Sequence, residues 1–189
     1  MAMALEPPGL DPTTAAAAAI AEVTLYNVYE TLTKINEDGS VSPLLAESWQ
    51  ASEDLKTYTF KLRKGIKFQN GEPFDAAAVK FSFDRNAAAN STNKDKSLYQ
   101  SFASVTAPDS DTIVVAVKYS EPNLPFLLGQ ASGSIVEPKS APTDATQPVG
   151  TGPYTLGSWT KGSSITLNKW PDYRNASGAG RSAHGSSFA

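Results

Sequence analysis

The residues of this chain that could do chemistry are its carboxylates and a single histidine, His184, which lies close to the end of the sequence. A serine or cysteine nucleophile needs a base such as histidine beside it. The chain contains no cysteine and no G-x-S-x-G motif, and no patterned segment surrounds His184. We therefore expect no nucleophilic catalysis, no thiolate metal site and no disulfide.

Two carboxylate pairs, Glu53-Asp54 and Asp109/Asp111, could in principle support acid–base chemistry. That chemistry requires environments that push the two pKa values apart, whereas both pairs fall in predicted turns where water solvates them equally. The second pair begins like a calcium loop but lacks the glycine and the closing glutamate of that motif. We predict a protein that is not an enzyme and needs no cofactor or metal.

The segment 150–154, Gly-Thr-Gly-Pro-Tyr, has the glycines of a phosphate-binding loop. It lacks the Lys-Ser/Thr pair of that loop, and Pro153 has no backbone N–H to donate. An alternating strand pattern follows it, where a phosphate loop would open a helix. We interpret the segment as a tight turn, and a contact with a ligand remains open.

The segments that would position these residues centre on residues 41–85. Residues 57–63 alternate strictly between apolar and polar, as in a half-buried strand. A short run at 66–68 follows, and Asn70-Gly71 predicts a turn. Asp75 can accept the free N–H groups of a helix predicted for 76–86. The apolar side chains expected in the core are Leu44, Leu45, Trp49, Tyr58, Phe60, Leu62 and Phe83.

Other elements follow from the same patterns. We predict a helix over 15–34 with a threonine cap at Thr13 or Thr14, and a second, short helix over the apolar positions from Leu98 to Val105. Residues 112–119 are β-branched and predict a strand, whereas 131–148 are rich in Ser, Pro and Thr and indicate a surface connection. A further short helix is expected near 126–128, and a hairpin is expected at 154–168 around a Lys161-Gly162 turn.

Composition limits the class of protein. The 189 residues are 40% hydrophobic and 19% charged, which is typical of a globular protein. The net charge of −3 provides no attraction for nucleic acid or an anionic membrane. No apolar run approaches the ~20 residues that span a bilayer.

Several ordered motifs resemble the signature segment of the family 5 extracellular solute-binding proteins. They are L-A-E-S-W at 45–49, Y-T-F-x-L-R-x-G-I-K-F at 58–68, N-G-E-P-F-D-A at 70–76 and V-x-F-S-F-D-R at 79–85, flanked by L-D-P at 10–12 and P-V-G-T-G-P-Y at 148–154. W-P-D-Y at 170–173 is similar to the N-P-D-Y of the family. The resemblance covers roughly residues 5–173.

The resemblance implies an α/β fold, part of a periplasmic-binding-protein type II-like architecture. It implies four regions: 1–37 in the first lobe, 38–148 in an inserted small domain, 149–175 returning to the first lobe, and 176–189 as a disordered tail. We expect the second lobe to be absent, through truncation, a frame shift or an added tail.

The resemblance also implies a function and a site. The parent protein would be periplasmic and would capture a small solute, a peptide, for the membrane permease of an ABC importer. The alternative is a remnant with no solute affinity. The chain can also self-associate through the surface of the first lobe that the absent lobe would leave exposed. No signal peptide is evident, so we expect one to have been removed. The ligand-binding residues expected from the family are Thr13, Thr14, Ala15, Tyr99, Gly150, Thr151, Gly152 and Tyr154. For three of these residues a structural role competes with ligand binding. Thr13 or Thr14 can cap a helix, and Tyr99 can pack in the core.

Overall fold

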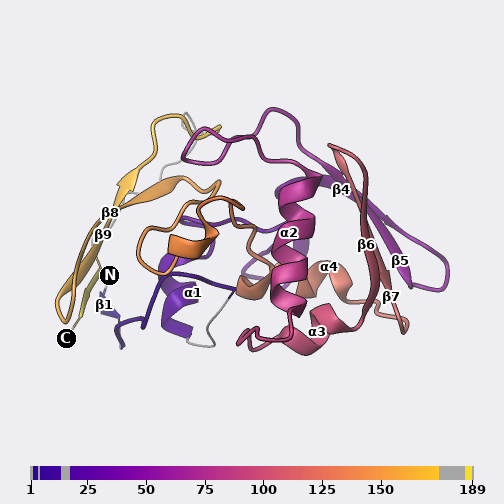
Figure 1. Ribbon diagram of the computed structural model, residues 1–189, viewed down its shortest axis with the longest axis horizontal. Helices are drawn as coiled ribbons and strands as arrows, with labels where there is room; N and C mark the ends of the chain where they lie inside the picture. The colour runs from indigo at the N-terminus through magenta and orange to yellow at the C-terminus, as the bar shows by residue number, and fades with distance from the viewer. Residues whose placement is uncertain (1, 4, 14–17, 175–185, 189) are drawn as a thin grey trace.

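A four-stranded antiparallel sheet in the order β4-β5-β7-β6 forms the centre of one end of the molecule (Figure 1). The computed structural model describes all residues except 1, 4, 14–17, 175–185 and 189. The strands are β4 (Ala46–Ala51), β5 (Thr57–Leu62), β6 (Phe102–Asp109) and β7 (Thr112–Val117). The predicted strand at 57–63 is therefore confirmed.

The face of this sheet that carries Tyr58, Phe60 and Leu62 forms the main core. The burial pattern of β5 alternates as its sequence does, because successive side chains of a strand point to opposite faces. Helix α2 (Ala76–Ala87) contributes to the same buried cluster through Val79 and Phe83. Sheet and helix thus bury each other's apolar surface.

The start of α2 is capped as the sequence predicts. The Asp75 carboxylate accepts a hydrogen bond from the backbone N–H of Ala78 at 3.0 Å. Gly71 has φ +88°, which agrees with the Asn70-Gly71 turn. Within the described part of the chain, the short run at 66–68 forms no strand of its own and pairs through an isolated bridge between Lys67 and Pro73.

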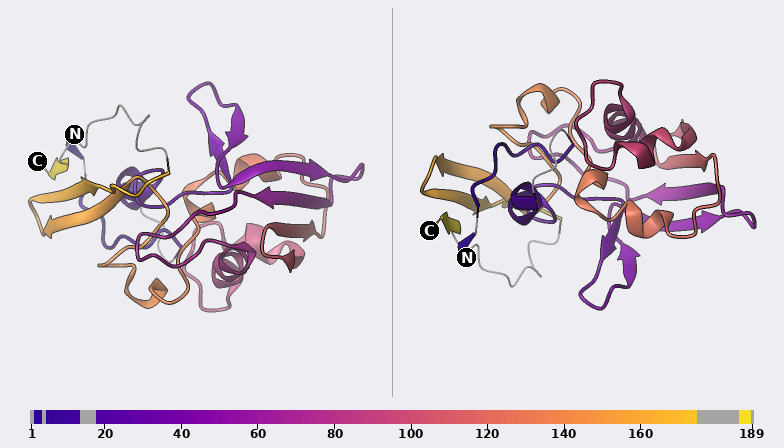
Figure 2. Two further views of the ribbon diagram at one scale, coloured as in Figure 1. Left: turned by 90° about the horizontal axis from the view of Figure 1, so that it is seen from above. Right: turned by 90° about the horizontal axis from the view of Figure 1, so that it is seen from below.

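The long helix predicted for 15–34 is wrong in its described part. Helix α1 covers only Ala18–Thr24. The Thr24 carbonyl then accepts the N–H groups of Asn27, Val28 and Tyr29, and Tyr26 adopts φ +59°. β-branched and aromatic residues dominate after Val23 and favour helix weakly. The chain continues instead into β2 (Thr33–Ile35) and β3 (Val41–Pro43), a hairpin that projects sideways (Figure 2).

Helix α3 (Lys96–Gln100) ends where the prediction continued to Val105. Residues Phe102–Asp109 form edge strand β6, because the backbone of β7 offers them an antiparallel partner. The predicted strand at 112–119 is confirmed as β7. The predicted short helix near 126–128 is confirmed as α4 (Leu124–Leu127).

The prediction of 131–148 as a surface connection is wrong for its first part. The chain there forms two 3₁₀ turns, η1 (Ala131–Gly133) and η2 (Ala141–Thr143). Ile135 and Val136 between them are fully buried. The backbone N–H of Val136 donates to the Ser82 hydroxyl of α2, which attaches this buried stretch to the helix.

The other end of the molecule carries the predicted hairpin, β8 (Tyr154–Thr160) and β9 (Ser164–Lys169) (Figure 1). Gly162 turns the chain with φ +72°. Strand β9 pairs with β10 (Ser186–Phe188), and β10 pairs in parallel with β1 (Ala2–Met3). The tail at 176–189, for which disorder was predicted, lies outside the described residues except for 186–188. The four-region division of the chain remains a prediction.

Candidate functional site

The turn at Gly150-Thr151-Gly152 lies directly against the backbone that follows α1. The N–H of Gly152 donates to the Val28 carbonyl at 2.9 Å, and the N–H of Tyr154 donates to the Asn27 carbonyl at 3.0 Å. A β-carbon on Gly152 would lie 2.3 Å from the Asn27 oxygen. The glycines therefore permit a close approach of two backbones.

The side chain of Gln69 fixes the same turn from the opposite side. Its Nε2 donates to the carbonyls of Gly152 and Tyr154, at 3.0 and 2.8 Å. Its Oε1 accepts the N–H of Gly150 at 3.2 Å, and the backbone N–H of Gln69 donates to the Gly150 carbonyl. Both glycine N–H groups are thus occupied by the protein itself, which argues against a phosphate-binding loop.

Glu30 is a buried carboxylate, 2% exposed, at the back of this turn. The Arg174 guanidinium donates to both carboxylate oxygens, at 2.7 and 2.8 Å. The Thr151 and Tyr173 hydroxyls donate to one oxygen each, at 2.8 and 2.9 Å. Burial alone would lower the pKa of Arg174, but the hydrogen bonds and charge of Glu30 outweigh it and raise the pKa.

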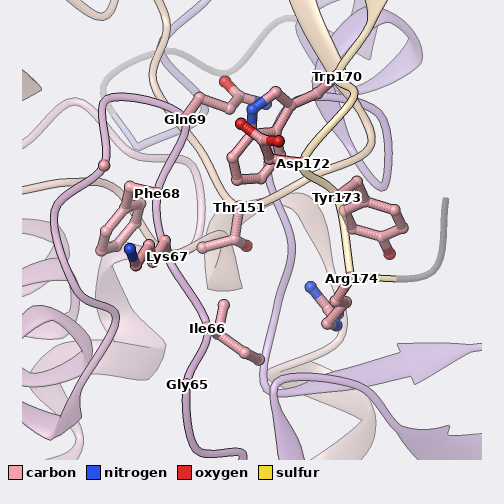
Figure 3. A pocket seen from close by; sticks show the side chains of 11 residues that line it. Gly65, Ile66, Lys67, Phe68, Gln69, Thr151, Trp170, Asp172, Tyr173 and Arg174 are labelled. Carbon is pink, nitrogen blue, oxygen red and sulfur yellow. The ribbon is translucent and has the colours of Figure 1, made fainter.

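These contacts border a concavity of about 270 Å³. One wall is residues 65–69 and the opposite wall is residues 170–174, with Thr151 between them (Figure 3). Such a volume is just below the range of about 300–1,000 Å³ that is usual for small-molecule sites. Its lining residues are Gly65, Ile66, Lys67, Phe68, Gln69, Gly71, Thr151, Trp170, Asp172, Tyr173 and Arg174.

The lining combines aromatic faces with two opposite charges, in addition to Arg174, which pairs with Glu30. Trp170 and Tyr173 are half-buried and Phe68 is fully buried. Lys67 and Asp172 are exposed at the same concavity. This combination can contact an apolar group and pair with both a carboxylate and an ammonium group.

A second buried ion pair lies beside the predicted ligand residue Thr13. Arg85 of α2 donates to both oxygens of Asp11, at 3.0 and 2.7 Å, and also contacts the Thr13 hydroxyl. The backbone and hydroxyl of Thr13 donate to the Asp11 carboxylate as well. Thr13 is fully buried, so its polar groups serve this network.

Asp144 lies fully buried near the same network. Burial, together with the negative charge of Asp11, raises the pKa of Asp144 to about 7. Its Oδ1 accepts the N–H of Val149 at 3.4 Å. Burial also raises the pKa of Tyr29 well above its ordinary value, to which the charge of Asp144 contributes. A carboxyl that takes up a proton near neutral pH is thus built into the interior.

The predicted ligand residues do not gather at one place. Thr151 lines the concavity, Gly150 and Gly152 belong to the same buried turn, and the buried Tyr154 begins β8. Tyr99 is 2% exposed and packs between Phe83 and Phe102, with ring centroids 5.5 and 5.4 Å away. Thr14 and Ala15 lie outside the described residues. Whether any of these residues binds a ligand stays a prediction.

Sequence reasoning missed Glu30, Gln69 and Arg174. Glu30 was assigned to a helix, and Gln69, which precedes the predicted Asn70-Gly71 turn, was given no role. The W-P-D-Y motif at 170–173 was noted for its resemblance alone, although its position after the hairpin brings it back to the Gly150 turn through the hydrogen bond from Trp170 N–H to the Pro153 carbonyl. Within the described residues, no group of three His, Cys, Asp or Glu side chains could hold a metal ion.

The family profile of bacterial extracellular solute-binding proteins, family 5, matches residues 40–184. The glutathione-binding protein GsiB of Escherichia coli K12 is 32% identical over 158 residues, which are 82% of this chain and 31% of that protein. The chain therefore spans about a third of the length of the curated relatives it matches.

Solved structures show the same fold. AgaA from A. tumefaciens R10, in complex with agropinic acid, superposes with a TM-score of 0.89 at 28% identity, over 97% of this chain and 38% of that one. DppA from Helicobacter pylori, in complex with the peptide STSA, gives 0.81 at 27% identity, over 98% and 41%. The mixed α/β fold expected from the sequence is that of about 40% of a periplasmic binding protein.

Proposed function

The chain belongs to the bacterial extracellular solute-binding proteins of family 5, and on that premise we propose that it forms one wall of a receptor site for a small peptide. The family is one of binding proteins and not of enzymes. The receptor works in the periplasm and delivers its solute to the permease of an ABC importer. No helix among the described residues is long and apolar enough to cross a bilayer.

The observation that carries the proposal is the concavity between 65–69 and 170–174. Its aromatic faces, Trp170 and Tyr173, offer apolar contact, and Lys67 and Asp172 can pair with the carboxylate and ammonium ends of a short peptide. Both charges are exposed, so water screens them and each pair contributes little affinity.

We expect the isolated chain to bind peptides weakly, because it supplies only one side of the receptor site, and one side covers about half of a solute. The dissociation constant should be in the millimolar range, a binding free energy of about −4 kcal/mol. Calorimetry and NMR titration with mixed di- and tripeptides test this, with signals of Trp170 and Tyr173 expected to shift. A micromolar affinity would mean that the whole site lies within these residues. No shift at tens of millimolar peptide would favour a module without solute affinity.

A further inference from the structure

The contacts of Glu30 connect three segments that are distant in sequence. Its two carboxylate oxygens accept two hydrogen bonds each: Oε2 from Thr151 and Arg174, and Oε1 from Tyr173 and Arg174. These partners lie 121 to 144 residues further along the chain. A carboxylate that is 2% exposed is stable as an anion only when such donors replace water.

The three donors of Glu30, namely Thr151, Tyr173 and Arg174, line the concavity, whereas Glu30 itself does not. Figure 3 shows Tyr173 and Arg174 on one segment, across the concavity from residues 65–69. The carboxylate therefore holds the wall at 170–174 against the Gly150 turn from behind. Trp170 belongs to the same wall, and the hydrogen bond from its N–H to the Pro153 carbonyl, at 2.8 Å, continues the attachment.

We propose that Glu30 is the positioning residue of the solute site: its pairing with Arg174 fixes the wall at Trp170–Arg174 and thereby sets affinity for the solute. This rests on the proposed function, in that the concavity is taken to be the solute site. Bidentate pairing of a guanidinium with a carboxylate fixes direction as well as distance, so a simple charge cannot replace it.

The Asp11–Arg85 pair is a matched control. Its side chains are 5% and 22% exposed, and those of Glu30 and Arg174 are 2% and 23% exposed. Both pairs are bidentate. Loss of either arginine leaves a buried carboxylate uncompensated and should lower Tm by a similar amount. Neither Asp11 nor Arg85 lines the concavity, so only the loss of Arg174 should alter the wall.

The test uses the full chain with Trp49→Phe and Trp159→Phe, so that Trp170 is the only tryptophan. Arg174→Met, Arg174→Lys, Arg85→Met and the double variant Glu30→Leu/Arg174→Met are compared with this background. The readouts are Tm, acrylamide quenching of Trp170, amide exchange of Trp170 and the NMR titration with di- and tripeptides. Quenching and amide exchange of Trp170 measure how firmly the wall at 170–174 is held, and they need no ligand.

In Arg174→Met we expect the amide of Trp170 to exchange at least ~10-fold faster than in the background variant. Acrylamide should quench Trp170 more easily, and peptides should bind more weakly. Arg174→Lys should restore slow exchange, low quenching and peptide binding only in part. Arg85→Met should lower Tm without changing the wall. In the double variant an apolar pair replaces the ion pair, so Tm should recover in part while the wall stays loose. Full recovery is not expected, because the hydroxyls of Thr151 and Tyr173 lose the acceptor that Glu30 provides.

Two results would overturn the inference. One is a double variant in which exchange and quenching of Trp170 recover together with Tm, because the pair would then be structural only. The other is peptide binding that is unchanged by Arg174→Met. If the background variant binds no peptide at all, the proposed function fails, and the part of the inference that concerns affinity fails with it. Quenching and exchange of Trp170 still decide whether Glu30 holds the wall.

Discussion

Gly150 lies so close to Val28 that a β-carbon on the glycine would be 2.0 Å from the Val28 carbonyl oxygen. The neighbouring atom belongs to the backbone and cannot rotate away. The first glycine of this motif, which looks like that of a phosphate loop, is thus required because two backbone segments pack closely against each other. The same contact holds Thr151 at the concavity.

Gly150→Ala should therefore destabilise the protein by about 3 kcal/mol, at the upper end of the usual range for overpacking. Urea unfolding followed by circular dichroism measures the change. Gly9→Ala is the control, because a β-carbon there would meet Ala145 at an ordinary 3.5 Å. Equal urea midpoints for the two variants would show that the close approach does not constrain the fold.

Local signals in the sequence predicted the elements that local interactions determine. The alternation of β5, the Asp75 cap and the turn at Gly162 each depend on residues a few positions apart. The predicted helix at 15–34 failed because the bonds to the Thr24 carbonyl and the pairing of β2 with β3 replace helical bonds. These competing bonds are themselves local, and the β-branched and aromatic residues after Val23 were the signal in the sequence against a long helix.

Trp49 shows how a correct partner can come with the wrong burial. It was expected in the core, and it does pair with Phe60 across β4 and β5, with ring centroids 6.3 Å apart. Strand β4 lies at the edge of its sheet, so Trp49 is only half-buried and packs against the main core at its margin, not within it.

Trp49→Ala should accordingly cost only about 1–2 kcal/mol, less than the ~3–5 kcal/mol typical of a large aromatic in the core. Phe60→Ala, at a fully buried position on the neighbouring strand, should show the larger cost. The two variants are compared by their urea midpoints. A larger loss for Trp49→Ala than for Phe60→Ala would contradict the half-buried position of Trp49.

The cap of α2 makes a separate prediction. Asp75→Ala removes the acceptor for the Ala78 N–H and should cost about 1 kcal/mol. Asp84→Ala on the same helix loses only an exposed pair with Lys80, for which about 0.5 kcal/mol or less is expected. Thermal unfolding of both variants distinguishes a cap from a general loss of acidic charge.

The wall of the concavity at 170–174 was the part that the sequence could least predict. Glu30 has its hydrogen-bond donors more than 120 residues away, so no local pattern marks it. Gln69 likewise contacts Gly152 and Tyr154 from a different part of the chain. The Gly150 turn was identified because glycine spacing is visible in the sequence, whereas its partners depend on the assembled fold.

Asp144 should make stability fall as pH rises from about 4 to 7. Its folded-state pKa of about 7 lies above the ordinary value of 3.8, so in this interval the folded protein binds a proton that the unfolded chain has lost. The stabilising contribution is complete below pH 4 and disappears as pH approaches 7. A pKa difference of this size between the folded and unfolded states corresponds to a free energy on the order of 4 kcal/mol.

Asp144→Asn should remove this dependence, because an amide stays neutral and its oxygen can still accept the N–H of Val149. The variant should therefore be more stable than the parent at pH 8 and close to it at pH 4. Asp38→Asn is the matched control at an exposed turn where hydrogen bonds from Ser40 lower the pKa. Urea midpoints measured from pH 4 to 8 decide the matter: parallel curves for the parent and Asp144→Asn would mean that Asp144 stays ionised in the folded protein.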